Sequence, residues 1–259
     1  MREIYAIVTI AYRDLMKLLR DPARLISTFI FPLLFILILG GSMQANLGQG
    51  LGYNFLPYVF TGVFAQTLFQ SAAMGIVSLI DDRENDFSQE IFVSPISRYS
   101  IIMGKILGET LVALTQGLGI LVFGFVAGVR FSILQLFGLL WVGIVVCLFA
   151  GAFGVIILSN LPTRRTADQI FPFIMLPQFF LAGVFNPIRV LPWYLDILSR
   201  ISPMRYAVDL TRGIFYAGGG DYTKVVLQGP VFNLGIMITA FLVFLVIGTF
   251  IFVRNERYR

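Results

Sequence analysis

Long uncharged apolar segments alternate with short polar segments along the chain. The first of these segments contains no Asp, Glu, Lys or Arg from Leu25 to Ile80. A helix of about 20 apolar residues is long enough to cross the ~30 Å hydrocarbon layer of a membrane. Residues 1–259 are therefore predicted to form one all-α transmembrane domain. We expect six membrane-spanning helices, at about 25–43, 54–80, 101–127, 132–158, 169–185 and 231–253.

The composition excludes two other fold classes. The chain is 58% hydrophobic and 13% charged, whereas about a quarter of the residues in soluble domains are charged. A transmembrane β-barrel requires strands of about ten residues with alternating apolar and polar positions. The apolar segments of this chain do not alternate, so helices remain the predicted spanning elements.

Residues 1–22 have the pattern of an amphipathic helix. Arg13 and Lys17 lie off its apolar face, and Asp21-Pro22 ends it. No small-residue cleavage site follows the next apolar segment, so we interpret the region as a helix on the inner membrane surface and not as a signal peptide. The apolar face is predicted to contain Ile4, Ile7, Val8, Ala11, Leu15 and Leu18.

An acidic tract, "DDRENDFSQEIFVSPISR", begins at residue 81, in the polar segment 81–100. Asp86 and Gln89 have the spacing of a capping box, and Pro95 ends the apolar run that follows. Phe87 and Ile91 then fall on one helical face. The tract is predicted to be a short helix parallel to the membrane, with a solvated loop as an equal alternative.

The distribution of Lys and Arg places both termini in the cytoplasm. This orientation leaves thirteen of the 19 basic residues inside and puts the long segment 186–230 outside. Its aromatic residues and prolines predict short re-entrant helices in the outer leaflet, with an ordinary external loop as the alternative. Anionic lipids account for the net charge of +5 without a nucleic-acid partner.

Several polar residues lie inside the predicted spans. Glu109 follows Lys105 by one helical turn. A carboxylate inside a span often marks a functional site, but snorkelling or pairing near the inner interface is an equal alternative, and we interpret Glu109 as structural. Gly104 and Gly108 have a spacing that permits close helix packing. The sequence has no histidine and one cysteine, which disfavours a hydrolase, a haem protein, a disulfide framework and a metal site.

Two segments carry a family resemblance. "DDRENDFSQEIFVSPISRYSIIMGKILGE" resembles the first cytoplasmic loop of ABC-2 type permeases, especially the daunorubicin-resistance-like exporters. "LPWYLDILSRISPMRYAVDLTRGIFYAGG" resembles the closing signature of the same family, and the resemblance covers essentially the whole chain. The motif positions are Pro95, Ser97, Arg98, Gly104, Lys105, Tyr206, Ala207, Asp209 and Arg212.

The resemblance implies a permease subunit that dimerises and binds two ATPase subunits. The chain has no phosphate-binding loop, since its only Gly-Lys pair is followed by Ile106, which has no hydroxyl for Mg²⁺. We therefore expect no cofactor and no catalytic residue in this chain, and expect ATP and Mg²⁺ to bind to the partner. The predicted ATPase-coupling residues are Glu84, Asp86, Phe87, Glu90, Ile91, Pro95 and Arg98.

The resemblance also places the second and fifth spans along the substrate path. Buried amides need hydrogen-bond partners, so the glutamines in these spans either hold helices together or contact cargo. The predicted path residues are Phe64, Gln66, Gln70, Phe171, Gln178 and Phe180.

The expected function is export of a drug-like or lipid-like amphipathic compound across a bacterial or archaeal plasma membrane. A polysaccharide or teichoic-acid permease is an alternative within the family. An ion-coupled secondary transporter or a membrane enzyme is an alternative from another class. The absence of histidine and the scarcity of charge inside the spans disfavour that second alternative.

Overall fold

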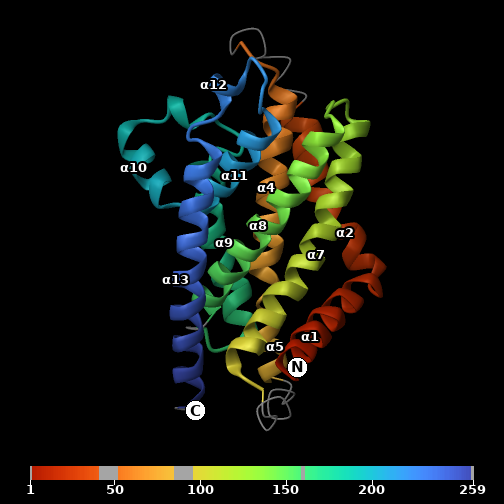
Figure 1. The fold of residues 1–259 in the computed structure, drawn as a ribbon, viewed down its shortest axis with the longest axis vertical. Coiled ribbons are helices and arrows are strands. Elements are labelled where there is room, and N and C mark those ends of the chain that lie inside the picture. Colours follow the sequence, from red (N-terminus) through yellow and green to blue (C-terminus); the bar gives the residue numbers. More distant parts are fainter. Residues whose placement is uncertain (1, 41–51, 85–95, 159–160, 258–259) are drawn as a thin grey trace.

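The computed structural model describes residues 2–40, 52–84, 96–158 and 161–257, and every regular element in these ranges is helical. The helices form an elongated bundle (Figure 1). Both termini lie at the end of the bundle that also contains α5 and the start of α7, whereas α12 lies at the opposite end. This arrangement agrees with an even number of crossings.

The first half of the chain begins with α1, which ends before the Asp21-Pro22 pair, as predicted. Pro22 starts α2, where its missing N–H is tolerated, so this helix begins three residues before the predicted span. The predicted residues 41–43 lie outside the described ranges. The elements are α1 (Arg2–Leu19), α2 (Pro22–Phe35), a π-helix η1 (Ile36–Gly40), α4 (Phe55–Gly75) and α5 (Ser78–Glu84).

The predicted span 54–80 is not one continuous helix. Helix α4 ends at Gly75, and α5 begins at Ser78. The Ser78 hydroxyl donates a hydrogen bond of 2.6 Å to the Gly75 carbonyl. Asp81 and Asp82 consequently belong to α5, although the sequence pattern assigned them to the following loop.

The second half contains three long helices and a group of short ones. Helix α9 begins five residues before the predicted fifth span, where Thr163 caps it by accepting a hydrogen bond from the Thr166 N–H. The elements are α7 (Arg98–Val126), α8 (Ile133–Leu158), α9 (Arg164–Leu181), η2 (Ile188–Val190), α10 (Trp193–Ile201), α11 (Pro203–Phe215), α12 (Tyr222–Val225) and α13 (Pro230–Arg257).

Four helical stretches in the described ranges are long and apolar enough to cross a membrane. They are Phe55–Asp82, Arg98–Val126, Ile133–Ile157 and Pro230–Asn255. Helix α2 contributes a shorter apolar stretch, Leu25–Ile38. Helix α9 has 18 residues, about 27 Å of helix, but charged residues occupy its first turns. The six-span topology therefore remains a prediction.

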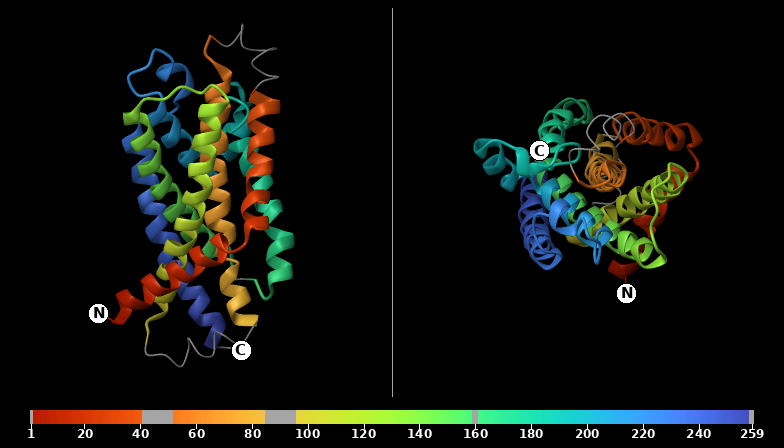
Figure 2. Two further views of the ribbon diagram at one scale, coloured as in Figure 1. Left: turned by 90° about the vertical axis from the view of Figure 1, so that its right-hand side faces the viewer. Right: turned by 90° about the horizontal axis from the view of Figure 1, so that it is seen from above.

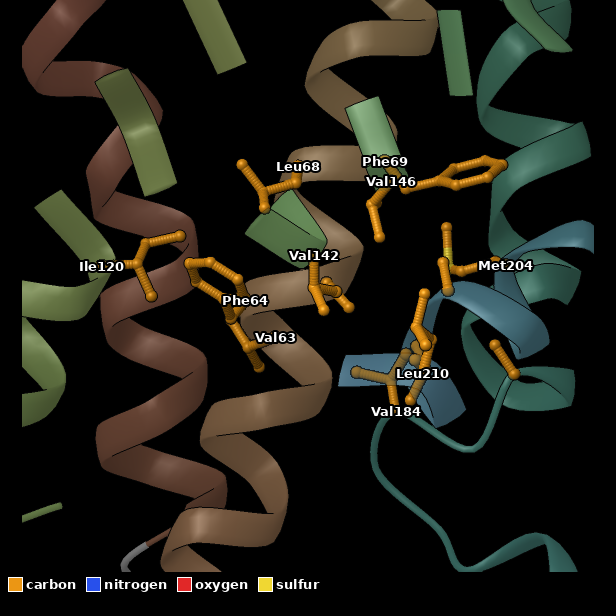
Figure 3. Close-up of a cluster of buried hydrophobic side chains, with 14 of the residues drawn as sticks. Val63, Phe64, Leu68, Phe69, Ile120, Val142, Val146, Val184, Met204 and Leu210 are labelled. Atoms are coloured by element: carbon orange, nitrogen blue, oxygen red, sulfur yellow. The ribbon is translucent and has the colours of Figure 1, made fainter. Parts of the chain in front are cut away.

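Helix α4 is the centre of the bundle (Figure 2). Side chains within the described ranges bury 72% of its most apolar stretch, compared with 22% for α13. Side chains of α4, α7, α8 and α11 meet in the apolar core (Figure 3), where Phe64 and Leu68 are at most 1% exposed. The core therefore fixes α4 on several sides and leaves α13 at the periphery.

Helix α1 packs along α7 through the two glycines that the sequence singled out. A Cβ atom at Gly104 would lie 3.2 Å from the Ile7 Cα, and one at Gly108 would lie 3.1 Å from the Ala11 Cα. This confirms the predicted close helix approach and identifies α1 as the partner helix. The apolar positions of α1 are divided, because Ala11 packs inward while Ile4 is 66% exposed.

Candidate functional site

A groove of about 710 Å³ lies between α1, α2, α4, α7 and α9. Helices α2 and α9 lie on either side of α4 when the bundle is viewed along its length (Figure 2). Pro32 and Phe35 of α2, Val63 of α4, Val112 of α7 and Phe179 of α9 give the groove an apolar surface. The groove can therefore contact the apolar body of a ligand from several helices.

Helix α4 provides a polar strip within this groove. Gln66 and Gln70 are one turn apart and share the strip with Thr67 and Ser71, while Gln116 of α7 also lines the groove. Gln66 is 4% exposed, and its Oε1 atom has no hydrogen-bond partner among the described residues. A buried amide oxygen without a partner is unfavourable, so the groove contains an acceptor suited to a ligand donor.

A buried ion network lies below this strip, at the end of the bundle near the termini. Lys105 of α7 is 1% exposed, and its Nζ atom lies 3.1 Å from Asp14 Oδ2 of α1 and 2.9 Å from Asp82 Oδ2 of α5. A buried ammonium requires such partners, because removing it from water without them is costly. The network therefore fixes three helices to one another.

The hydroxyl of Ser78 connects this network to the groove. It accepts a hydrogen bond of 3.0 Å from Lys105 Nζ and lies 3.2 Å from Glu109 Oε1. Glu109 is 4% exposed and lines the groove. Lys105 thus pairs with Asp14 and Asp82, and Ser78 lies between Lys105 and Glu109.

Arg13 of α1 extends the network to its surface. Its Nη2 atom donates a hydrogen bond of 2.7 Å to Asp82 Oδ2. Partial burial alone would lower the pKa of the Arg13 guanidinium, but its hydrogen bond with Asp82 and the charge of Asp14 outweigh burial and raise the pKa. Arg13 therefore stays protonated and keeps α1 attached to α5.

The predicted path residues occupy different environments. Gln66 and Gln70 line the groove, but Phe64 and Phe171 are 1% and 2% exposed within the core. Phe180 lies on the outside of α9, 56% exposed. The structure thus separates the two glutamines of α4 from the three aromatic residues.

Gln178 is attached to α11 and to its own helix. Its Oε1 atom accepts a hydrogen bond of 3.3 Å from the Met204 N–H, and its Nε2 atom donates to the Ile174 carbonyl. These contacts hold α9 and α11 together within the chain.

The predicted coupling residues Asp86, Phe87, Glu90, Ile91 and Pro95 lie outside the described residues. Their flanking helices are described, since α5 ends at Glu84 and α7 begins at Arg98.

Both flanks contact α1. On the first, Arg13 binds Asp82, and on the second, the Glu3 Oε2 atom accepts a hydrogen bond of 3.1 Å from the Ser97 N–H. These contacts were not predicted, because nothing in the spacing of the sequence indicates which residues α1 faces.

The closing signature occupies the opposite end of the bundle. The Arg212 guanidinium lies 3.6 Å from the centre of the Tyr58 ring, and its Nη2 atom donates a hydrogen bond of 2.8 Å to the Gly183 carbonyl. Asp209 accepts hydrogen bonds of 2.8 Å from the Leu227 N–H and from Asn233 Nδ2. These residues attach α11 to α4 and α13.

An apolar helical bundle with a polar groove among its helices is the arrangement of a multi-pass membrane transport protein. Residues 5–216 match the family described as "ABC-2 type transporter". The chain belongs to this family and is a transport permease of the ABC-2 type.

Relatives with assigned names are also transport permeases. The chain is 25% identical to "Putative transport permease ycf38" of Cyanophora paradoxa over 97% of this chain and 88% of that protein. It is 28% identical to "Probable multidrug ABC transporter permease YbhR" of Escherichia coli K12 over 54% and 38% of the two chains. It is 22% identical to "Inner membrane transport permease YadH" of the same strain over 68% and 69%.

Proposed function

We propose that this permease is the membrane subunit of an ATP-driven exporter for a drug-like or lipid-like amphipathic compound. A homodimer in the plasma membrane, with its termini in the cytoplasm, binds two separate ATPase subunits that hold ATP and Mg²⁺. The family membership supports an ATPase partner. The name of the relative YbhR, a probable multidrug permease, supports a drug-like cargo.

The contact of α1 with both flanks of residues 85–95 is the observation that carries the coupling proposal. Arg13 contacts Asp82 on one flank, and Glu3 contacts Ser97 on the other. A segment fixed at both ends transmits a displacement to its flanking helices. We therefore place the ATPase contact at 81–100, where Phe87 and Ile91 enter an apolar groove of the ATPase.

The acidic residues of this tract form the charged part of the proposed ATPase contact. We expect Glu84, Asp86 and Glu90 to pair with basic residues on the ATPase surface, which mainly sets the orientation and rate of association. Pro95 is the predicted end of the coupling helix, and Arg98 begins α7.

The groove provides the cargo site of this proposal. Its volume of about 710 Å³ lies within the range of small-molecule sites, about 300 to 1,000 Å³. Its polar strip, with Gln66 and Gln70, faces apolar residues of the neighbouring helices. This combination suits an amphipathic compound better than an inorganic ion.

The ion network joins the two sites. Movement of α5 by the ATPase displaces Asp82 relative to Lys105, and Ser78 carries the displacement to Glu109 in the groove wall. ATP hydrolysis thereby changes the shape of the cargo site without a direct contact between cargo and ATPase.

Two substitutions test the coupling contact. Glu90→Lys and Ile91→Asp are expected to leave the permease inserted and dimeric but to weaken ATPase co-purification and ATP-dependent transport. Ile91→Asp is the more severe, because it buries an unpaired charge. Ser88→Ala is the matched control within the same tract. Normal ATPase binding and transport by both variants would remove the coupling assignment.

A third substitution tests the cargo site. Gln70→Leu is expected to change the stimulation of ATPase activity by cargo while the complex still assembles. Loss of assembly would instead show that Gln70 holds helices together.

A further inference from the structure

The charged residues that line the groove are arranged in two levels. At the end near the termini, Lys17, Asp21, Asp81 and Arg164 come from helix ends and junctions, and Asp81 forms an ion pair with Arg164. Such charges lie near water and are screened. They therefore contribute little to the selection of a ligand deeper in the groove.

Glu109 occupies the inner level. Of the groove-lining residues that the structure describes, it is the one ionisable group that lies within a span and away from that span's ends. The carboxylate packs beside Gly75, where a side chain would collide with it. The glycine at residue 75 therefore leaves the room that this carboxylate occupies.

The inner level offers acceptors to a ligand. The Gln66 Oε1 atom is buried with no hydrogen-bond partner among the described residues, and it shares the groove with the Glu109 carboxylate. A protonated amine has N–H donors and no acceptor, so it matches the Glu109 carboxylate. Gln66 precedes Gly75, beside which Glu109 packs, by nine residues, or about 13 Å of helix, so its oxygen can accept from a second donor on an elongated cargo. The Glu109 charge would repel an anionic ligand, and such a ligand would provide no donor for the Gln66 oxygen.

The nearby cation Lys105 belongs to the buried ion network. Lys105 is 1% exposed and contacts Asp14, Asp82 and Ser78.

We propose that the groove selects amphipathic cargo bearing a protonated amine, and that Glu109 is the specificity-determining residue that pairs with this amine. The inference rests on the proposed function, since it names the chemical class of the cargo for the same groove. A charge at membrane depth requires a counter-charge, and Glu109 supplies it beside an apolar surface that holds the rest of the molecule.

A matched pair of fluorescent probes tests the charge preference. Dansylcadaverine carries a protonated amine on an apolar body, and its N-acetyl derivative is neutral. The full-length permease in nanodiscs, corrected for empty nanodiscs, is expected to bind the amine about tenfold or more tightly than the acetylated compound. Glu109→Gln should remove most of this difference by weakening the amine alone. Asp168→Asn, outside the groove, is the control and should change neither affinity.

A measurement on the unmodified protein avoids dependence on a variant that fails to fold. A carbodiimide joins a carboxylate to an amine as an amide while the carbodiimide is converted to its urea. With dansylcadaverine, peptide mass spectrometry should find this amide at Glu109. An excess of the acetylated probe, which cannot react, should compete poorly.

Equal binding of the two probes, no binding of either, or amide formation confined to surface carboxylates would overturn the assignment. Equal weakening of both probes by Glu109→Gln would also overturn it and leave Glu109 a structural residue. These results are distinct from failure of the proposed function, which is measured by ATPase co-purification and ATP-dependent transport. A groove that binds both probes equally remains a cargo site without charge selection.

Discussion

Lys105 Nζ lies 2.9 Å from Asp82 Oδ2, which joins two helices that flank the predicted ATPase contact. The side chain of Lys105 is 1% exposed and that of Asp82 is 13% exposed. Coulombic attraction between such groups is stronger than at a protein surface, but each group pays a desolvation cost. The pair therefore matters mainly for position, because losing one partner leaves the other buried and charged.

Replacement of this lysine tests the network. Lys105→Met is expected to destabilise the permease by about 3 kcal/mol, because Asp14 and Asp82 lose their shared counter-charge. The measurement is thermal unfolding of the purified protein in detergent. Adding Asp14→Asn to Lys105→Met should restore part of the loss. A double variant no more stable than the single one would contradict the assigned pairing.

The packing of α1 on α7 depends on the small residue at position 108. Gly108→Val is expected to displace α1 and to separate Asp14 from Lys105, since even a Cβ there would lie 3.1 Å from the Ala11 Cα. Limited proteolysis should then cut α1 faster. Gly235→Val in α13 is the control, because a Cβ there meets nothing within 4 Å. Equal proteolysis of both variants would argue against close α1–α7 packing.

The closing signature is expected to act as a structural anchor. Arg212→Ala removes the contact with the Tyr58 ring and the hydrogen bond to Gly183, which should cost about 2 kcal/mol or more. Arg165→Ala is the matched control, because its side chain is exposed. Unfolding temperatures of the two variants provide the comparison, and a similar decrease for both would contradict the anchor role.

The ion pairs of α10 predict a dependence on pH. Partial burial would raise the pKa of Asp196, but its hydrogen bonds with Arg200 and Arg205 outweigh burial and lower the pKa below its ordinary value of 3.8. A lowered pKa means that the stabilisation is complete above the ordinary value and disappears as the pH falls through the folded-state value.

The direction of this pKa shift predicts how the stabilities of the wild type and of Asp196→Asn differ with pH. The unfolding temperature of the wild type should exceed that of Asp196→Asn at pH 7, and the difference should shrink as the pH falls below the ordinary value of 3.8 and through the lower folded-state value. A difference that persists in acid would show that the asparagine acts through packing and not through charge.

The topology can be tested with a single cysteine. Gly219→Cys in a Cys147→Ser background is expected to react with an impermeant maleimide added to intact cells, because residue 219 is exposed near α12, at the end opposite the termini. Cys147 itself is buried. Labelling that requires lysis of the cells would overturn the proposed orientation.

The sequence predicted the helices more accurately than their partners. Periodicity identified α1 as amphipathic, and the spacing of Gly104 and Gly108 predicted a close helix contact. Neither pattern shows that these features meet, because the contact joins residues about ninety positions apart, as in the bond between Lys105 and Asp14. Pairing over such separations depends on the packed bundle and leaves no local periodic signal.

In the cargo groove, too, the sequence indicated which side chains share a helical face but not which residues they contact. The one-turn spacing placed Gln66 and Gln70 on one face of α4, and both line the groove. Glu109 was interpreted as structural, since snorkelling or pairing was expected near Lys105, and this interpretation stays a prediction. The sequence did not show that Lys105 pairs with residues of α1 and α5. The break after Gly75 was also missed, since uninterrupted apolar residues predict a continuous helix.

The side chain of Glu109 occupies the space that any residue larger than glycine would need at position 75. The two positions are therefore coupled in packing. Among ABC-2 permeases, a larger residue at the position equivalent to 75 should accompany a shorter one at the position equivalent to 109. Such paired exchanges would mark relatives whose groove has a different inner end.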